Sequence, residues 1–224
     1  MLKLISVLTL TWHVLAEVPT DEERKAILEC HTKLREHVNP PASNMMLMNY
    51  SIEMENLAVK YFANCRLPVD REPFQGTSEL LMDELPERPQ FVQQLCQVNG
   101  NNYDYVRDQC NAPCSDYNLM AWAVSTQVGC ALKTCPNRSD DSKSTYTLVC
   151  LYKPGDDSLT GRPYESGRSC SQCPDGYTCR RNQCYKGIPP TTSTSIAMPT
   201  TSIGAVLPTV GALIFAVLLL HCLE

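Results

Sequence analysis

The feature that most constrains this chain is its set of 13 cysteines in 224 residues. One of them, Cys222, lies in the extreme C-terminal tail, so an even number, 12, remains if that tail is removed. A dense, even set of cysteines in an exported chain predicts a framework of disulfide bonds. Zinc is the alternative, but the one close pair with metal-type spacing is Cys170-x-x-Cys173, and no histidine lies near it. We therefore expect the cysteines to be oxidised in pairs.

The first 16 residues predict export. Lys3 supplies a positive charge, the run from Leu4 to Ala16 is uncharged and mostly apolar, and the small Ala16 precedes the polar Glu17. This is the layout of a signal peptide, with cleavage expected after Ala16. A buried N-terminal helix is the alternative, but the run is short and a helix start follows it at once. We expect the mature chain to work outside the cytoplasm.

The C-terminal part divides into three segments of different composition. Residues 156–187 contain four cysteines and almost no apolar residues for a core, so two local disulfides would have to hold this module. Residues 188–202 are rich in Pro, Thr and Ser, which predicts a solvated stalk that can carry O-glycans. Residues 203–224 form a hydrophobic tail.

The hydrophobic tail has two interpretations. A transmembrane helix usually needs about 20 apolar residues and basic residues on its cytoplasmic side, but no Lys or Arg follows this tail. A glycolipid-anchor signal has small residues at the attachment site and a terminal hydrophobic run. Ser202 and Gly204 nearly fit this pattern. We favour the lipid anchor over a single membrane span, and expect the protein on the outer face of the plasma membrane.

The charge balance disfavours one class of partner. The chain has 19 basic and 24 acidic residues, and no basic run exceeds two residues. Proteins that bind nucleic acids carry basic patches or stripes, so nothing in this sequence indicates a nucleic-acid partner.

Two acceptor triplets predict N-linked glycans. They are Asn49-Tyr50-Ser51 and Asn137-Arg138-Ser139. Both lie in predicted turns of an exported chain, so we expect Asn49 and Asn137 to carry glycan.

The first predicted helix has clear ends. Thr20-Asp21-Glu22-Glu23 is a capping box, and apolar residues then recur at three- and four-residue spacing as far as Val38. Asn39-Pro40-Pro41 ends the helix. His31 falls on the apolar stripe, so we expect it to be a packed core residue rather than a ligand.

The remaining pattern indicates an α+β layered domain. A second helix is predicted over 51–65, a short helical stretch over 90–96, and antiparallel strands over 129–135 and 146–152. Two helices followed by paired strands favour layered packing of helices against a sheet. The sequence pattern of residues 66–116 as a whole does not predict their structure.

Several short motifs occur in order along residues 21–153. They are His31-Thr32-Lys33-Leu34-Arg35, Pro41-Ala42-Ser43-Asn44-Met45, Leu57-Ala58 through Ala63-Asn64-Cys65, Trp122-Ala123, Val128-Gly129-Cys130-Ala131, Cys135-Pro136, and Tyr146 through Val149-Cys150-Leu151-Tyr152. These motifs resemble those of the CAP superfamily of cysteine-rich secretory proteins, venom antigen 5 and plant pathogenesis-related proteins. With its sequons, stalk and tail, the chain resembles the venom allergen-like proteins of parasitic worms. The resemblance implies a CAP-type α-β-α sandwich over 17–155 and a small disulfide-linked hinge module over 156–187.

The resemblance also implies particular disulfides. These are Cys65–Cys135 and Cys130–Cys150 in the domain, and Cys170–Cys179 and Cys173–Cys184 in the hinge module. Four cysteines then remain for two further bonds with three possible pairings, namely Cys30, Cys96, Cys110 and Cys114. We expect Cys110 and Cys114 to be too local to pair with each other, and Cys30 to pair with one of them.

Many members of the resembled family hold a cleft in which two His and two Glu bind a divalent metal ion. The corresponding positions fall near Val69 or Asp70, at Ser78 with Glu79 beside it, near Val98 or Asn99, and at Asp116. No imidazole remains among them, and zinc prefers imidazole together with carboxylate or thiolate. We therefore expect neither a metal nor another cofactor. We expect Glu79 and Asp116 to be solvated loop carboxylates rather than an acidic cleft.

The sequence shows no catalytic constellation. A nucleophile needs a base and an orienting group within reach, but His31 and His37 lie on different faces of one predicted helix. Our hypothesis is an extracellular, non-enzymatic binding module, since the resemblance implies proteins that engage host or partner proteins or carry sterols and fatty acids. Met45-Met46-Leu47-Met48 could line a lipid groove, but core packing is the better interpretation. The alternative is a metal-dependent hydrolase, which the missing histidines disfavour.

Overall fold

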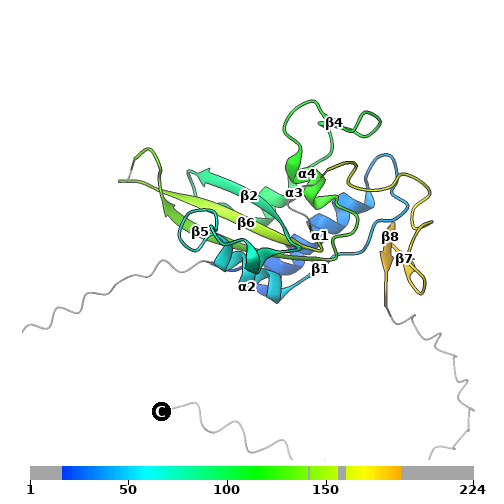
Figure 1. Ribbon diagram of the computed structural model, residues 1–224, viewed down its shortest axis with the longest axis horizontal. Coiled ribbons are helices and arrows are strands. Elements are labelled where there is room, and N and C mark those ends of the chain that lie inside the picture. Colours follow the sequence, from blue (N-terminus) through cyan, green and yellow to red (C-terminus); the bar gives the residue numbers. More distant parts are fainter. Residues whose placement is uncertain (1–16, 141, 156–159, 188–224) are drawn as a thin grey trace, which may run out of the picture. The chain divides into compact units, whose positions relative to one another are not determined.

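The computed structural model describes residues 17–140, 142–155 and 160–187 (Figure 1). The predicted signal peptide, the stalk and the hydrophobic tail with Ser202 and Gly204 lie outside the described residues, so their assignments stay predictions. Within the described part, no helix is both long enough and apolar enough to cross a membrane.

A four-stranded sheet forms the middle layer, with the strand order β1-β5-β6-β2. Its strands are β1 (Asn49–Tyr50), β2 (Ser78–Leu85), β5 (Gln127–Pro136) and β6 (Ser144–Lys153). β6 runs antiparallel to both β5 and β2, and β1 runs parallel to β5. The predicted pair of antiparallel strands is therefore confirmed. The sequence does not predict β2, because its apolar and charged residues do not alternate regularly.

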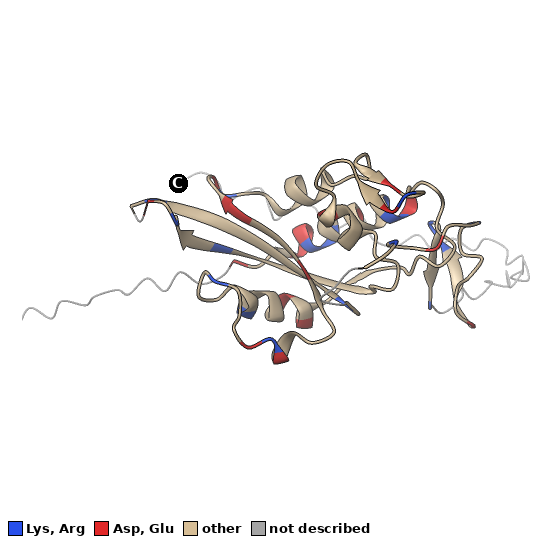
Figure 2. Ribbon diagram, turned by 45° about the horizontal axis from the view of Figure 1, so that its top comes forward, with Lys and Arg blue, Asp and Glu red and all other residues tan. Residues whose placement is uncertain are grey.

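Helices cover both faces of this sheet. They are α1 (Asp21–Glu36), α2 (Ile52–Tyr61), α3 (Phe91–Cys96) and α4 (Ser115–Met120), with a 3-10 turn at Glu72–Phe74. Figures 1 and 2 show α2 on one side of the sheet and the other three helices on the opposite side. Successive side chains of a strand point to opposite faces. Accordingly, Leu80 of β2 packs in the cluster of Phe91, whereas Leu81 packs against the cluster of Tyr61. The expected α+β architecture is confirmed.

The first helix begins as predicted, and the second ends early. The N–H of Thr20 donates to the Glu23 carboxylate at 2.8 Å, and the N–H of Glu23 donates to the Thr20 hydroxyl at 3.2 Å. α2 ends at Tyr61 rather than at Cys65. Cys65 instead has a left-handed backbone, with φ 56°, and its sulfur is bonded to Cys135 at the end of β5. Leaving the helix allows this side chain to reach β5.

Arg35 of α1 is completely buried, and no carboxylate among the described residues pairs with it. Its guanidinium donates hydrogen bonds of 2.8–3.1 Å to the backbone carbonyls of Met46, Met120, Trp122, Ala123 and Ser125. Burial lowers the pKa of this side chain to about 9. The last residue of the first sequence motif therefore holds two loops against α1.

The described residues contain six disulfides, including the four that the resemblance implies. The other two are Cys30–Cys96 and Cys110–Cys114. The expectation that Cys30 pairs with Cys110 or Cys114 is wrong, because packing of α3 against α1 brings the Cα atoms of Cys30 and Cys96 to 4.9 Å. Cys110 and Cys114 do pair, because the turn between β4 and α4 sets their Cα atoms 5.9 Å apart, a normal distance for a disulfide.

The hinge module contacts α1 directly. It contains a hairpin of β7 (Thr178–Arg180) and β8 (Gln183–Tyr185). Arg181 in its turn donates to the carboxylates of Glu29 at 2.7 Å and Glu36 at 2.8 Å. The buried amide of Gln183 donates to the Thr32 carbonyl at 3.2 Å. These contacts fix the hairpin to the sandwich.

Candidate functional site

Two of the positions corresponding to the family cleft lie near α2. Glu79 of β2 accepts a hydrogen bond from the Tyr61 hydroxyl at 2.6 Å and forms an ion pair with Arg71 at 3.3 Å. The expectation of a solvated loop carboxylate is therefore wrong for Glu79, because strand alternation turns its side chain towards α2. Asp70 is exposed in the loop after α2, where it accepts a hydrogen bond from the N–H of Glu72 at 3.0 Å.

The other positions lie on the opposite face of the sheet. Ser78 is buried at the start of β2, opposite Tyr152 in β6. Asp116 is half-buried in the first turn of α4 rather than in a loop, and burial raises the pKa of its carboxyl group. Asp116 and Glu79 therefore do not form one acidic cleft. Within the described residues, no group of three or more His, Cys, Asp or Glu side chains could hold a metal ion.

His31 is a core residue, as the sequence predicts. It is fully buried, and its Nδ1 lies 2.8 Å from the Ile27 carbonyl oxygen while its Nε2 lies 3.0 Å from the Tyr152 hydroxyl. Burial lowers the pKa of the imidazole to about 4. Both ring nitrogens are occupied by neutral protein groups, so His31 is not placed to bind a metal.

The methionine run also fills the core. Met45 and Met48 are 0% and 1% exposed, and they pack in two different clusters of buried side chains. These two side chains do not line an open lipid groove, which agrees with the interpretation of core packing.

Three hollows gather around the segment from Gln97 to Leu119. The first, of about 190 Å³, is lined by Asp116 together with Asn99 and Asn102. The second, of about 430 Å³, lies between this segment and the end of α1. The third, of about 500 Å³, lies beside the Cys110–Cys114 disulfide. These hollows surround a part of the chain whose structure the sequence does not fix.

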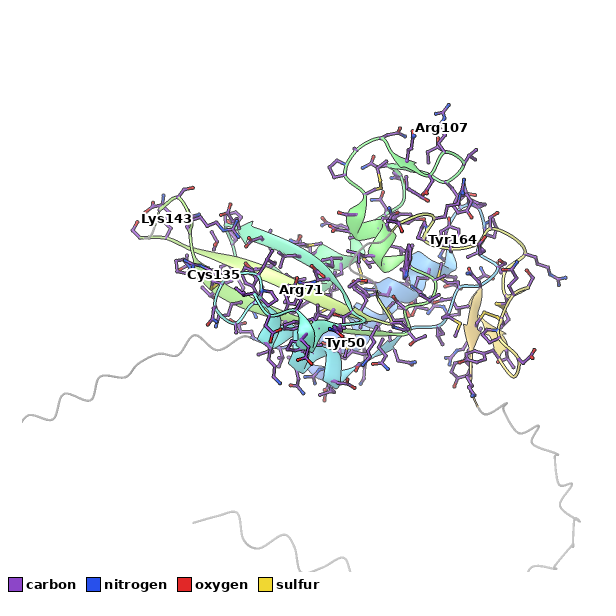
Figure 3. The ribbon with its side chains drawn as sticks, viewed as in Figure 1. Tyr50, Arg71, Arg107, Cys135, Lys143 and Tyr164 are labelled. Atoms are coloured by element: carbon purple, nitrogen blue, oxygen red, sulfur yellow. A yellow bond between two sulfur atoms is a disulfide. The ribbon has the colours of Figure 1, made fainter. Side chains whose placement is uncertain are left out.

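A hairpin that we call the finger, residues 103–110, projects from the same segment. Its strands are β3 (Tyr103–Asp104) and β4 (Gln109–Cys110). Val106 in its turn is 82% exposed, and the side chain of Arg107 is 75% exposed. Figure 3 shows Arg107 at the outer end of the finger, pointing away from the sheet. The finger therefore presents an exposed apolar side chain and an exposed cationic one, whose guanidinium forms an ion pair of 3.4 Å with Asp104 of the same hairpin.

The turn of the finger is held by its own polar groups and by a distant arginine. Oδ1 of Asp104 accepts hydrogen bonds from the N–H groups of Val106 at 3.0 Å and Arg107 at 3.1 Å. Arg162 donates to the carbonyls of Tyr105 at 3.0 Å and Val106 at 2.9 Å. Both peptide groups beside Val106 are thus fixed.

Aromatic stacking connects the finger to the core. The ring of Tyr105 stacks on the buried ring of Tyr164 with a centroid distance of 5.0 Å, and the Arg162 guanidinium lies 5.3 Å from the centroid of Tyr105. The Tyr103 hydroxyl donates to Asp108 at 2.7 Å. The Cys110–Cys114 disulfide closes the base of the finger. The finger is exposed, yet its conformation is fixed.

Sequence reasoning identifies neither the finger nor the hollows. The only signal is local: Tyr103, Asp104 and Tyr105 follow the polar Asn99-Gly100-Asn101-Asn102 loop. The residue that fixes the turn, Arg162, is far away in the sequence, and no periodicity connects the two segments.

The two sequons lie at the surface. Asn49 is exposed in β1 rather than in the predicted turn. Asn137 lies in the turn after β5, where its Oδ1 accepts hydrogen bonds from the N–H groups of Ser139 at 2.8 Å and Asp140 at 3.0 Å. Glycosylation of both residues stays a prediction.

The fold and its cross-links define the class of protein: an α-β-α sandwich with its own disulfides, followed by a small C-terminal hairpin module that holds two more. Residues 28–152 match the model of the CAP family, described as the cysteine-rich secretory protein family. The chain belongs to this family, and the resemblance on the sequence motifs is confirmed.

Relatives share this region at moderate identity. Human cysteine-rich secretory protein LCCL domain-containing 1 is 33% identical over 186 residues, which cover 75% of this chain and 37% of that protein. Peptidase inhibitor 15-A of Danio rerio is 32% identical over 185 residues, which cover 73% of this chain and 70% of that protein. The chain therefore spans a little over a third of the length of the human relative.

A solved structure shows the same fold. The structure of venom allergen-like protein 4 of Schistosoma mansoni is 24% identical and matches with a TM-score of 0.51, over 69% of this chain and 100% of that chain. At this identity the likeness concerns the fold alone.

Proposed function

We propose that this chain is an extracellular, non-enzymatic binding module that engages another protein through the finger. Export and attachment to the outer face of a membrane are part of the proposal and rest on the sequence of the two ends. Membership of a family of secretory proteins supports the extracellular location.

The observation that carries the proposal is an exposed loop whose shape is fixed. Ordering a flexible loop on binding costs affinity, and a loop that is already ordered avoids this cost. Arginine is enriched among the residues that dominate binding energy at protein interfaces. Arg107 and Val106 therefore fit a partner that offers an apolar contact beside a carboxylate.

Proteases are one class of partner to include, because one relative carries the name peptidase inhibitor. A trypsin-like protease has a carboxylate at the bottom of its specificity pocket, which accepts an arginine side chain. The finger supplies such a side chain at its outer end (Figure 3).

The test is a binding screen of the purified full chain against secreted and cell-surface proteins, with trypsin among them. The double variant Val106→Ser/Arg107→Glu should lose the interactions that the unchanged chain makes. A matched control is Val69→Ser/Arg66→Glu, since Val69 is 101% exposed and Arg66 is also exposed on another loop. Equal losses in both variants, or retention of all interactions in the finger variant, would contradict the proposal.

Lipid carriage and metal-dependent hydrolysis are the other functions that family membership raises. Native mass spectrometry of the same preparation would detect a retained sterol or fatty acid, and an assay with added zinc would detect ester hydrolysis. A bound lipid without any protein partner would replace the proposal with lipid carriage.

A further inference from the structure

A second candidate binding site lies beside the finger and is independent of its turn. It is the hollow of about 430 Å³ between the C-terminal end of α1 and the 98–103 loop, which we call the Asn101 groove. Its volume lies within the range of about 300–1,000 Å³ that is usual for small-molecule sites. The groove shares Val98 and Asn99 with the positions that correspond to the family metal cleft, but Asp70, Glu79 and Asp116 do not line it.

The floor of the Asn101 groove is apolar and aromatic. Leu34 of α1, Val38 just after the helix, and Val98 of the loop contribute aliphatic surface. Tyr103 and Tyr117 contribute two rings, with centroids 5.7 Å apart and planes tilted by 42°. Such a floor can contact the C–H face of a ligand.

The rim of the Asn101 groove is polar. The lining contains Asn39, Asn101 and His37, and neither Lys, Arg, Asp nor Glu. Among the described residues, the side-chain amides of Asn39 and Asn101 have no hydrogen-bond partner, although each offers two donors and an acceptor. Nδ1 of His37 lies 2.8 Å from the Lys33 carbonyl oxygen, so Nε2 is the ring nitrogen left for a ligand.

The loop that forms one wall is held in place without a ligand. Asn99 accepts a hydrogen bond from the N–H of Asn101 at 3.1 Å and donates to the Gln97 carbonyl at 2.9 Å. Gly100 lies directly against the ring of Tyr117, where an added Cβ would be 2.7 Å from Cζ. The Asn101 groove is therefore preformed, and glycine is needed for the loop to lie on the ring.

We propose that the Asn101 groove binds an uncharged saccharide. A pyranose ring presents an apolar C–H face and a belt of hydroxyl groups that both donate and accept hydrogen bonds. The aromatic and aliphatic floor matches the face, and the two unpartnered amides with His37 match the hydroxyl groups. The absence of Lys and Arg from the lining disfavours sulfated or phosphorylated glycans. A sterol or fatty acid would make few hydrogen bonds to this exposed polar rim, so the rim would not contribute to its binding.

The experiment uses the purified full chain on an array of neutral oligosaccharides ending in glucose, galactose, mannose or N-acetylglucosamine, with heparin fragments for comparison. The best neutral oligosaccharide is then titrated by calorimetry. We expect binding that changes little when salt is raised from about 50 to about 500 mM, since no ion pair is involved. Saturation transfer in NMR spectra should be strongest to the ring C–H protons of the sugar.

Two variants make this test specific. Asn101→Ala should raise the dissociation constant about tenfold, because the ligand loses a hydrogen-bonding side chain. Asn111→Ala removes an exposed amide of the neighbouring segment outside the groove and should leave binding unchanged. The proposal is overturned if no neutral oligosaccharide binds, if only heparin fragments bind, or if the two variants weaken binding equally. The groove shares Tyr103 with the base of the finger, but neither Val106 nor Arg107 lines it, so these results do not bear on the protein-binding function.

Discussion

The hydroxyl group of Tyr152 in β6 donates a hydrogen bond to Nε2 of His31 in α1 across 3.0 Å, in a fully buried environment. The other ring nitrogen of His31 donates to the Ile27 carbonyl at 2.8 Å. One neutral tautomer satisfies both contacts, whereas a protonated ring would lose the acceptor that Tyr152 needs. This pair joins the first helix to the sheet and explains why the imidazole is structural.

The His31–Tyr152 pair predicts a loss of stability in acid. The folded pKa of His31 is about 4, whereas an unfolded histidine titrates near 6.5. Between these values the unfolded chain binds a proton that the folded chain does not, so the free energy of unfolding falls as the pH drops through this window. The contribution of His31, present above pH 6.5 and lost by pH 4, is about 3 kcal/mol.

Urea unfolding at several pH values measures this contribution. The variant His31→Gln should show a fall in unfolding free energy between pH 7 and 4 that is smaller by about 3 kcal/mol. His37→Gln is the matched control, because His37 is exposed at the C-cap of the same helix. An unchanged pH dependence in His31→Gln would show that the imidazole is not kept neutral by burial.

Arg35 is predicted to be the most sensitive charged residue of the sandwich. Arg35→Met leaves five backbone carbonyls without their shared donor, and should lower the free energy of unfolding by about 3–5 kcal/mol. Arg35→Lys should retain less than half of this contribution to the free energy of unfolding, because an ammonium group has only three donors. Arg107→Met at the exposed end of the finger should change stability by less than about 0.5 kcal/mol. Chemical unfolding of the three variants measures these changes in free energy. Equal losses in Arg35→Met and Arg107→Met would contradict the prediction.

The two types of disulfide should differ in their effect on stability. Cys110–Cys114 joins residues 4 apart in sequence, and Cys65–Cys135 joins residues 70 apart. Because the loss of unfolded-state entropy grows with loop length, replacing both cysteines by serine should cost about 2 kcal/mol for the short loop and about 4 kcal/mol for the long one. Unfolding of the two double variants in urea measures the difference. A larger cost for the short loop would mean that it contributes native contacts beyond the loop-closure entropy.

Arg162 should keep the finger in its fixed conformation, and its loss should leave the rest of the fold intact. In Arg162→Met the carbonyls of Tyr105 and Val106 lose their donor, so the amide hydrogens of 105–108 should exchange at least about tenfold faster. Arg168→Met is the control, since Arg168 is exposed near Arg162 in the sequence. Hydrogen exchange followed by mass spectrometry resolves this segment. Unchanged exchange in Arg162→Met would mean that the Asp104 contacts alone hold the finger.

Several elements of the fold follow from local sequence pattern. The capping box at Thr20 and Glu23 starts α1, and the apolar repeat along α1 buries His31. The alternating residues of β5 and β6 pair as predicted. Each of these features depends on residues close together in the chain, where backbone geometry and side-chain periodicity dictate the structure.

Other elements depend on partners that the sequence does not reveal. β2 forms because β6 offers a hydrogen-bonding edge, and α2 ends early because Cys65 bonds to Cys135. The pairing of Cys30 with Cys96 follows from how α3 packs on α1. Each result depends on contacts between distant segments, which override local preference.

The sequence by itself determined the family, the four disulfides that the family resemblance implies, and the absence of imidazole from the positions that correspond to the family cleft. Only the tertiary structure decided that Glu79 and Asp116 lie on opposite faces of the sheet, and that Arg162 fixes an exposed finger. The reason is physical. A motif records which residues are present within a few positions, whereas a binding surface is made by side chains that strand alternation and packing bring together from distant parts of the chain.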